Sequence, residues 1–257
     1  MVEGPTAKAY TIRINQEFSG EIVNNIFVKS KRIFIPLDTI VKKKFLNSDS
    51  IGKNILFFFD DVVIRVHLMM YGAIHIYEIS ESLLKPERQV KILIEGEKKK
   101  LVVYNAPIIE IDRKDRILER LRNELGPDPL SKEWNKEKAI QNILKFKDEK
   151  IGIVLLNQSA IAGIGNILRN EILFKAGISP ERKIKDLSIE EIEKIVSICE
   201  EISKEFLRLK IERKRIGPIL YVYNRYRGKC KICGSELKFY LQEPIKRKTF
   251  VCPKCQK

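Results

Sequence analysis

Four cysteines near the end of the chain constrain its fold more than any other feature. Cys230 and Cys233 form one Cys-x2-Cys pair, Cys252 and Cys255 form a second, and residues 234–251 separate them. Two such pairs at this spacing present four thiolates to one tetrahedral zinc ion. A site with four protein ligands leaves no open position for chemistry. We therefore expect one zinc ion with a structural role.

A large positive charge accompanies this motif. The chain carries 49 Lys and Arg residues against 34 Asp and Glu residues, a formal net charge of +15. Such a charge attracts polyanions, either nucleic acid or an anionic membrane surface. The longest apolar stretch, residues 55–59, is far too short to span a bilayer. The first residues do not resemble a secretory signal, so we expect an intracellular protein that binds nucleic acid and does not enter a membrane.

The pattern of apolar residues changes near the middle of the 257-residue chain, which is long enough for two domains. Residues 22–35 and 90–104 contain β-branched runs broken by polar turns, and residues 55–59 and 62–68 flank Asp60 and Asp61 as in a hairpin. After Asp112 the pattern becomes helical. Residues 126–129 (GPDP) suit neither helix nor strand, because proline lacks the amide hydrogen and glycine is too permissive. We place a hinge there.

One long amphipathic helix is predicted in the second half. Ser188 and Glu191 match a capping box, and apolar residues recur at three- and four-residue steps from Ile189 to Leu209. Cys199 lies on that apolar stripe, so we expect it to be a buried and unreactive thiol.

A basic segment leads from this helix to the first cysteine pair. Residues 208–231 contain nine Lys and Arg residues and a single acid, Glu212, with Tyr221, Tyr223 and Tyr226 among them. A solvated basic face would explain such a run. Its position beside a zinc knuckle favours contacts to phosphates, which position a protein on nucleic acid but read no sequence.

Two motifs in a fixed order resemble one known family. Residues 158–174 (QSAIAGIGNILRNEILF) resemble the helix-two-turn-helix signature of the formamidopyrimidine-DNA glycosylase and endonuclease VIII family, and residues 247–256 (RKTFVCPKCQ) resemble its terminal zinc finger. Residues 1–5 (MVEGP), 52–53 (GK), 67–72 (HLMMYG) and 125–130 (LGPDPL) extend the similarity over nearly the whole chain.

This resemblance implies the fold, the partner and the location of the protein. The expected fold is α+β: an N-terminal catalytic β-sandwich flanked by helices (residues 1–125), a hinge (126–131), and a helix-two-turn-helix domain (132–257) with a zinc-finger hairpin from about residue 228. The expected partner of the monomeric protein is damaged, double-stranded DNA. It would act in the cytoplasm on the nucleoid of a prokaryote, or in the nucleus of a eukaryote.

The resemblance also assigns catalytic roles to the N-terminus. In this family the amine exposed by removal of Met1 forms a Schiff base, and here that amine belongs to Val2. An α-amine has a pKa of about 7.7–8.0 and is partly neutral at pH 7, whereas an unperturbed lysine is almost wholly protonated. Glu3 matches the family's acid, which transfers protons to the sugar ring oxygen and in the later eliminations. Most members carry proline at this position, so Val2 leaves open whether the strand is cut by β- or by β,δ-elimination.

Further residues match positions that hold DNA. Lys53 would bind the phosphate beside the lesion, Asn166 would present its side chain and nearby amides to phosphates, and Arg247 would clamp the strand. Three consecutive side chains are expected to fill the gap left by the flipped nucleotide: Met69, Met70 and Tyr71. His67 and His75 are interpreted as structural.

The lesion is predicted from a missing loop. Members that prefer oxidised purines usually carry a long loop between the two-turn motif and the zinc finger, and residues 216–230 leave no room for one. Oxidised pyrimidines are therefore the predicted substrates. Two alternatives stay open: a family member that prefers oxidised purines, and a zinc-ribbon nucleic-acid-binding protein without catalysis, which would need neither the free amine nor Glu3.

Overall fold

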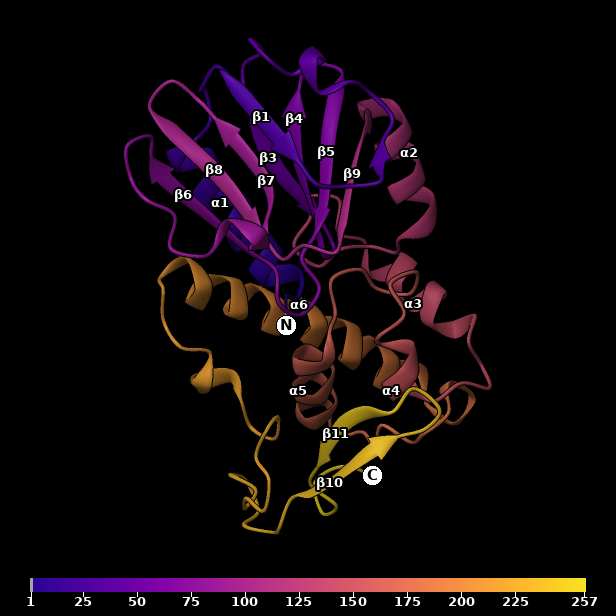
Figure 1. The fold of residues 1–257 in the computed structure, drawn as a ribbon. Coiled ribbons are helices and arrows are strands. Elements are labelled where there is room, and N and C mark those ends of the chain that lie inside the picture. Colours follow the sequence, from indigo (N-terminus) through magenta and orange to yellow (C-terminus); the bar gives the residue numbers. More distant parts are fainter. Residues whose placement is uncertain (1) are drawn as a thin grey trace. The chain divides into compact units, whose positions relative to one another are not determined.

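Two compact units make up the computed structural model, which describes residues 2–257 (Figure 1). One unit ends at Asn123 and the other runs from Glu124 to Lys257. No helix in this described range is long and apolar enough to cross a membrane.

The first unit is a β-sandwich, as expected from the resemblance (Figure 1). Neighbouring strands are antiparallel except β2, which lies parallel to β9. The four-stranded sheet has the order β1 (Asn25–Val28), β7 (Val90–Glu95), β8 (Lys99–Tyr104) and β6 (Ala73–Glu78). The five-stranded sheet has the order β2 (Arg32–Ile33), β9 (Ile108–Arg113), β5 (Val62–His67), β4 (Asn54–Phe59) and β3 (Asn47–Ile51).

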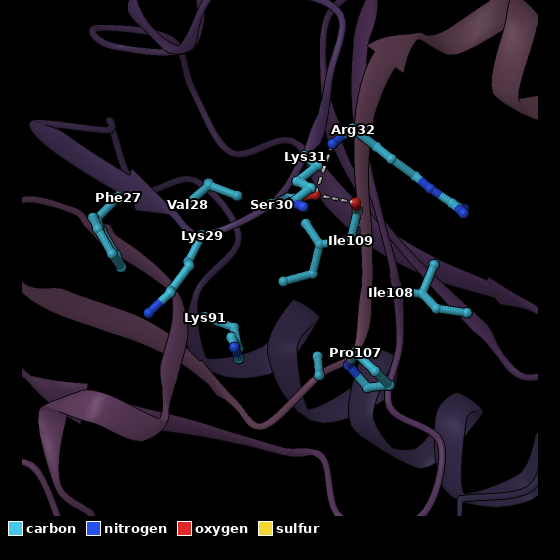
Figure 2. A pocket seen from close by; sticks show the side chains of 11 residues that line it. Phe27, Val28, Lys29, Ser30, Lys31, Arg32, Lys91, Pro107, Ile108 and Ile109 are labelled. Atoms are coloured by element: carbon cyan, nitrogen blue, oxygen red, sulfur yellow. Dashed lines mark hydrogen bonds between the residues drawn. The ribbon is translucent and has the colours of Figure 1, made fainter.

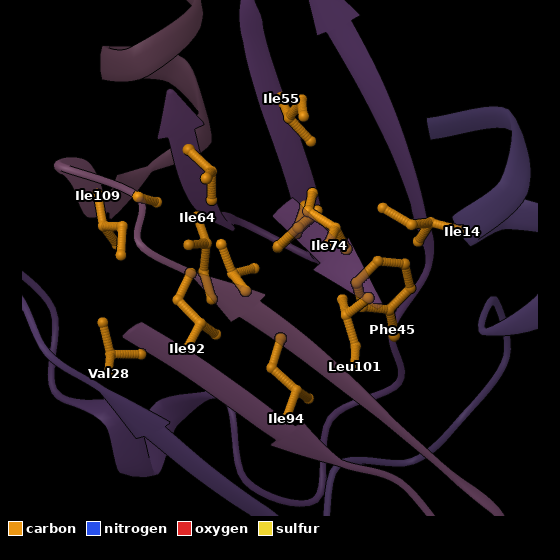
Figure 3. Close-up of a cluster of buried hydrophobic side chains, with 14 of the residues drawn as sticks. Ile14, Val28, Phe45, Ile55, Ile64, Ile74, Ile92, Ile94, Leu101 and Ile109 are labelled. Carbon is orange, nitrogen blue, oxygen red and sulfur yellow. The ribbon is translucent and has the colours of Figure 1, made fainter. Parts of the chain in front are cut away.

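Alternating side chains from both sheets build one core. Ile92, Ile94 and Leu101 of one sheet face Ile55 and Ile64 of the other (Figure 3). This alternation follows from the period of two along a strand, which sends every second side chain inward. The predicted hairpin is confirmed: β4 and β5 pair antiparallel across a tight turn.

Helices flank the sandwich. Helix α1 (Gly4–Glu17) begins directly after Glu3, has a proline in its first turn and buries Ala7 and Ile14. Proline suits that position because the first amides of a helix have no partner within it. Helix α2 (Lys114–Glu124) follows β9, and its Arg120 forms an ion pair with the buried Glu110 at 2.6 Å. Two short 3-10 turns complete the unit: η1 (Leu37–Thr39) and η2 (Glu87–Gln89).

The second unit is helical and ends in a hairpin. Its elements are α3 (Lys136–Leu144), α4 (Ile151–Val154), α5 (Asn166–Ala176), η3 (Ile184–Asp186), α6 (Ile189–Ile211), η4 (Gly217–Ile219), β10 (Lys238–Gln242) and β11 (Arg247–Val251). The predicted capping box of α6 is present, with Ser188 and Glu191 each accepting from the other's backbone. Cys199 is fully buried in this helix, and burial raises the pKa of its thiol. Residues 126–129 lie outside any helix or strand.

Candidate functional site

The start of α1 holds the two residues expected to carry the chemistry. Val2 is nearly buried, and its backbone nitrogen donates to the carbonyl oxygen of Met69 at 3.0 Å. Glu3 is fully buried and occupies the N-cap position, where its carbonyl accepts from the amide of Ala7 at 3.0 Å. Met1 lies outside the described residues. The structure thus fixes the Val2 nitrogen against the turn that follows β5.

That turn is tightly constrained. Met69 adopts a left-handed backbone conformation with φ of 51°, which side chains other than glycine rarely take. The amide of Gly72 donates to the carbonyl of Leu68 at 2.9 Å, and a Cβ at Gly72 would lie 2.6 Å from that carbonyl oxygen. Met69, Met70 and Tyr71 project from the turn, and Tyr71 is 79% exposed. The three side chains expected to act as a wedge are therefore accessible.

His67 connects this turn to Lys53. Its Nδ1 accepts from the Met69 amide at 3.2 Å, and it pairs with Asn54 across β4 and β5. Burial, and then the nearby charges of Lys53 and Arg65, lower the pKa of the imidazole to about 4. His67 is therefore neutral at pH 7 with Nδ1 free of a proton, as an acceptor must be.

Lys53 is held at the same end of the sheet by a two-residue turn. Ile51 and Asn54 pair across β3 and β4, and Gly52 adopts φ of 59° between them. Left-handed residues suit such a hairpin because they match the twist of the flanking strands. Within this one unit, the structure brings together Val2, Lys53 and residues 69–71 around His67. From the sequence alone, His67 is interpreted as structural. Its place two residues before Met69 is the only local signal for its hydrogen bond to the Met69 amide.

In the second unit, the two-turn motif is pinned by one side chain. Gln158 donates to the carbonyls of Leu156 and Ile164, both at 3.0 Å, and accepts from the amide of Gly163 at 3.0 Å. Gly163 takes φ of 88°, which explains a glycine at this place. The chain then enters α5 at Asn166.

Asn166 is less accessible than expected for a phosphate ligand. Its side chain is 4% exposed and donates to the carbonyl of Lys248 at 2.9 Å. Its Oδ1 is buried without a hydrogen-bond partner among the described residues. The observed contact joins the start of α5 to β11, the strand that carries the exposed Arg247.

Two further residues of α5 attach the same hairpin, and the sequence analysis did not single them out. Arg169, fully buried, donates to Gln242 Oε1 at 2.7 Å and to Thr249 Oγ1 at 2.8 Å. Asn170 Oδ1 accepts from the amide of Phe250 at 2.8 Å. Buried polar groups require such partners. Their signal in the sequence is that they form, with Glu171, a run of three polar residues between apolar residues of the helix.

Glu171 organises the segment between the helices and the cysteines. Its carboxylate accepts from the amides of Tyr221 at 2.7 Å, Val222 at 3.1 Å and Tyr223 at 2.7 Å. Burial raises the pKa of this carboxyl, while the three donors act in the opposite direction by favouring its charged form. The carboxylate thereby fixes the path of part of the basic segment 208–231.

The four paired cysteines converge on one point. The Sγ atoms of Cys230 and Cys255 are 3.9 Å apart, those of Cys233 and Cys252 are 3.5 Å apart, and all four lie within 4.8 Å of one another. A tetrahedral metal with metal–sulfur bonds of about 2.3 Å separates its ligands by about 3.8 Å. The donor set and its spacing therefore fit one metal ion.

Comparison with known proteins agrees with this geometry. The model of the formamidopyrimidine-DNA glycosylase H2TH domain matches residues 125–217. A formamidopyrimidine-DNA glycosylase from Brevibacillus brevis is 30% identical over 220 residues, which cover 80% of this chain and 78% of that protein. The formamidopyrimidine-DNA glycosylase of a Wolbachia species from Brugia malayi is 29% identical and covers 94% of this chain and 93% of its own.

Other relatives and a solved structure extend the match. The human endonuclease 8-like 3 protein is 26% identical over 81% of this chain, which corresponds to 34% of that protein. The structure of Lactococcus lactis Fpg in complex with DNA containing an abasic site has a TM-score of 0.87 and 21% identity, with 99% of both chains covered. This likeness confirms the expected α+β fold. Together with the sequence relatives, it shows that the chain belongs to the formamidopyrimidine-DNA glycosylase and endonuclease VIII family of DNA-repair glycosylases.

Proposed function

We propose that this DNA glycosylase excises oxidised bases through a Schiff base on the amine of Val2 and then cuts the strand as a lyase. The observation that carries the proposal is the position of the Val2 nitrogen, 3.0 Å from the carbonyl oxygen of Met69 and adjacent to the buried Glu3. Once Met1 is removed, that nitrogen is a free amine. An N–H that donates to Met69 then leaves the lone pair of the neutral amine for the sugar.

The chemistry follows from these groups. The neutral amine attacks C1′ of the damaged nucleotide, the N–C1′ bond forms, and the bond from C1′ to the base breaks, so that the base leaves with the bonding electrons and takes up a proton. Glu3, as the acid, supplies a proton to the ring oxygen O4′ as the ring opens, while the amine loses one proton and the protonated imine forms. Loss of a proton from C2′ then expels the 3′ phosphate and cuts the strand.

The valine affects the lyase step. An imine formed by a primary amine can lose its nitrogen proton, and only the protonated form withdraws electrons from C2′ effectively. We therefore propose that strand cleavage depends more strongly on pH than it would with a secondary amine. β-Elimination is the step that Val2 supports directly, and δ-elimination needs the imine to stay protonated for longer.

DNA is the partner that the charge and the family indicate. The solved Lactococcus lactis neighbours are complexes with DNA that contains an abasic site or a damaged base. Lys53 is proposed to hold the phosphate beside the lesion, and Met69, Met70 and Tyr71 to replace the flipped nucleotide in the stack. Asn166 at the start of α5 and Arg247 on β11 are proposed to grip the strand.

Oxidised pyrimidines are the proposed substrates. The support is the short connection between α6 and Cys230, which contains only the 3-10 turn η4. Oxidised purines are the second candidate, because several relatives are named formamidopyrimidine-DNA glycosylase and one solved neighbour is a complex of MutM with DNA that contains carbocyclic 8-oxo-G. Matched single-turnover excision of thymine glycol and 8-oxoguanine decides between them.

Zinc is the proposed metal of the cysteine cluster. Four thiolates are the ligand set of structural zinc, which contributes directly to folding. Hydrogen bonds from Ser235 lower the pKa of the Cys233 thiol and so favour its thiolate form. Elemental analysis of the purified protein is expected to find one zinc per chain.

Borohydride trapping tests the proposed nucleophile. Mass spectrometry is expected to show a chain without Met1, and reduction with an abasic-site oligonucleotide is expected to place the adduct on Val2. Lys53→Ala is expected to weaken trapping without abolishing it, and Glu3→Gln to impair base removal more than cleavage of a preformed abasic site. An adduct on Lys53, formed equally well by a chain that retains Met1, contradicts the proposal.

A further inference from the structure

A basic pocket at one edge of the sandwich takes no part in the chemistry above. It has a volume of about 790 Å³ and is lined by residues 27–32, Lys91 and residues 106–109 (Figure 2). β1 is an edge strand of the four-stranded sheet and β2 an edge strand of the five-stranded sheet, and the chain crosses between the sheets at the pocket. Its volume lies within the range of about 300–1,000 Å³ typical of ligand sites.

The pocket has only positive charge. Four of its lining residues are cations, and none is an acid: Lys29, Lys31, Arg32 and Lys91. None of these four forms an ion pair with any residue from 2 to 257. Like charges gathered in this way repel one another, and an anionic ligand relieves that repulsion.

The backbone beneath these cations is fixed rather than loose. The Ser30 hydroxyl donates to the carbonyl of Ile109 at 2.6 Å and accepts from the amide of Arg32 at 3.0 Å (Figure 2). The amide of Lys29 donates to the carbonyl of Lys91 at 2.8 Å, which places these two residues side by side. The cations are therefore presented on a preformed scaffold.

Exposed aromatic rings lie at both ends of residues 27–34. Phe27, which lines the pocket, is 48% exposed, and Phe34 is 62% exposed. Exposure of such large apolar rings costs free energy in water unless a partner covers them. Aromatic rings interleaved with cations form the surface on which unpaired bases stack while their phosphates are neutralised.

The pocket lies at the catalytic end of the five-stranded sheet. Ile108, one of its lining residues, pairs with His67 across β9 and β5, and His67 pairs with Asn54, next to Lys53. Lys53, in the turn between β3 and β4, and Ile108, at the start of β9, therefore lie at the same end of the strands of this sheet.

We propose that this pocket is a second DNA site that takes single-stranded DNA, with phosphates on its four cations and a base on Phe27. The assignment rests on the proposed function, which brings DNA to this end of the five-stranded sheet. An unpaired strand is required because the faces of bases in a duplex are covered by their neighbours. An acidic polypeptide would match the cations but would leave the aromatic rings without a stacking partner.

Fluorescence anisotropy with a labelled thymidine 12-mer tests the site in the full-length, metal-loaded protein. The pocket variant is Lys29→Gln/Lys91→Gln. The matched control is Lys42→Gln/Lys98→Gln, which removes the same charge from two exposed lysines near the opposite end of the four-stranded sheet. Phe27→Leu removes the ring while keeping an apolar side chain, and the melting temperature of each variant reports its folding.

The pocket variant is expected to bind the 12-mer more weakly than the control and to flatten the plot of log affinity against log salt by about 1.4, since each phosphate contact contributes about 0.7 for single strands. Phe27→Leu is expected to weaken binding roughly fivefold or more. Equal affinities in pocket and control variants overturn the proposal. An equal loss of affinity for duplex DNA also overturns it. The same holds if the pocket substitutions weaken binding of poly-glutamate but leave binding of the 12-mer unchanged. Lesion excision by the wild type is scored separately, so failure of the proposed function is distinguishable from failure of the pocket.

Discussion

Replacement of His67 by asparagine, glutamine or alanine tests which of its two ring nitrogens supports the turn that contacts Val2. In the structure Nδ1 accepts from the Met69 amide, and the Met69 carbonyl accepts from the Val2 nitrogen. His67→Asn keeps an acceptor close to the position of Nδ1, whereas His67→Gln places its amide nearer to the position of Nε2. His67→Ala removes both. We expect the asparagine variant to retain most of the rate of imine formation, and the other two to form the imine several-fold more slowly.

The size of the loss follows from the turn. One hydrogen bond contributes about 0.5–1.5 kcal/mol, and Met69 in its left-handed conformation is unfavourable by about 1–2 kcal/mol. Without the acceptor, the turn populates other conformations, and a loss near 1 kcal/mol corresponds to roughly a fivefold slower reaction. Single-turnover borohydride trapping on a preformed abasic site measures this rate without the base-removal step.

His75 on β6 provides the matched control, because the same substitutions there leave the turn intact. Full activity of His67→Ala contradicts the argument. Rescue by glutamine but not by asparagine also contradicts it, since Nε2 would then be the nitrogen that matters.

The same histidine makes stability depend on pH. Its pKa is about 4 in the folded protein and about 6.5 when unfolded, so the unfolded chain binds more protons between these values. Folding stability is therefore unaffected above pH 6.5 and is lost as the pH falls toward 4. The shift corresponds to at most about 3 kcal/mol, and to roughly 1 kcal/mol once solvent screening of this partly exposed ring is allowed for. Urea unfolding at pH 7 and pH 5 is expected to show a smaller difference for His67→Gln than for the wild type.

The remaining predictions concern the second unit and the substrate. Cys252→Ser is expected to lose the metal, unfold the β10–β11 hairpin and abolish DNA binding; a zinc-free protein with full activity, found by elemental analysis, contradicts this. Glu171→Gln keeps the shape but replaces one acceptor oxygen by a donor, so we expect a loss of about 1–3 kcal/mol in urea unfolding, and an unchanged midpoint would refute the role of the three amide bonds. Binding to undamaged duplex is expected to be independent of sequence and to fall steeply with salt, and a salt-insensitive affinity would exclude phosphate contacts as its main source. Thymine glycol is expected to be excised faster than 8-oxoguanine, and a clear reversal in matched assays would favour the purine alternative.

Local patterns allowed much of the fold to be predicted. The hairpin around Asp60, the capping box at Ser188 and the cysteine cluster each depend on residues close in sequence or on a spacing with one geometric meaning. Period-two alternation identified strands in the first half but gave neither their order nor the parallel pairing of β2 with β9. Strand order depends on contacts between distant segments, for which a single sequence has no local signal.

The contacts of the candidate site were harder to predict for the same reason. The sequence predicts that Asn166 contacts phosphates, but it gives no signal for the bond that its side-chain amide donates to the carbonyl of Lys248, 82 residues away. Arg169 and Asn170 bind the hairpin over similar separations. A motif gives the residue types at such positions, but the partner of each buried polar group becomes evident only when the distant strand is in place.

The turn after β5 contains one strained residue, Met69, whose conformation positions groups of the candidate site. An unfavourable conformation persists only where the surroundings hold it, and at Met69 the amide is bonded to His67 while the carbonyl is bonded to Val2. The carbonyl can face the N-terminus because the backbone takes the left-handed form. The same conformation directs the residues that follow it outward, where Met70 and Tyr71 are exposed. Placement of the proposed nucleophile and presentation of the proposed wedge are therefore coupled through one residue, and a change that relaxes Met69 is expected to affect both imine formation and base flipping.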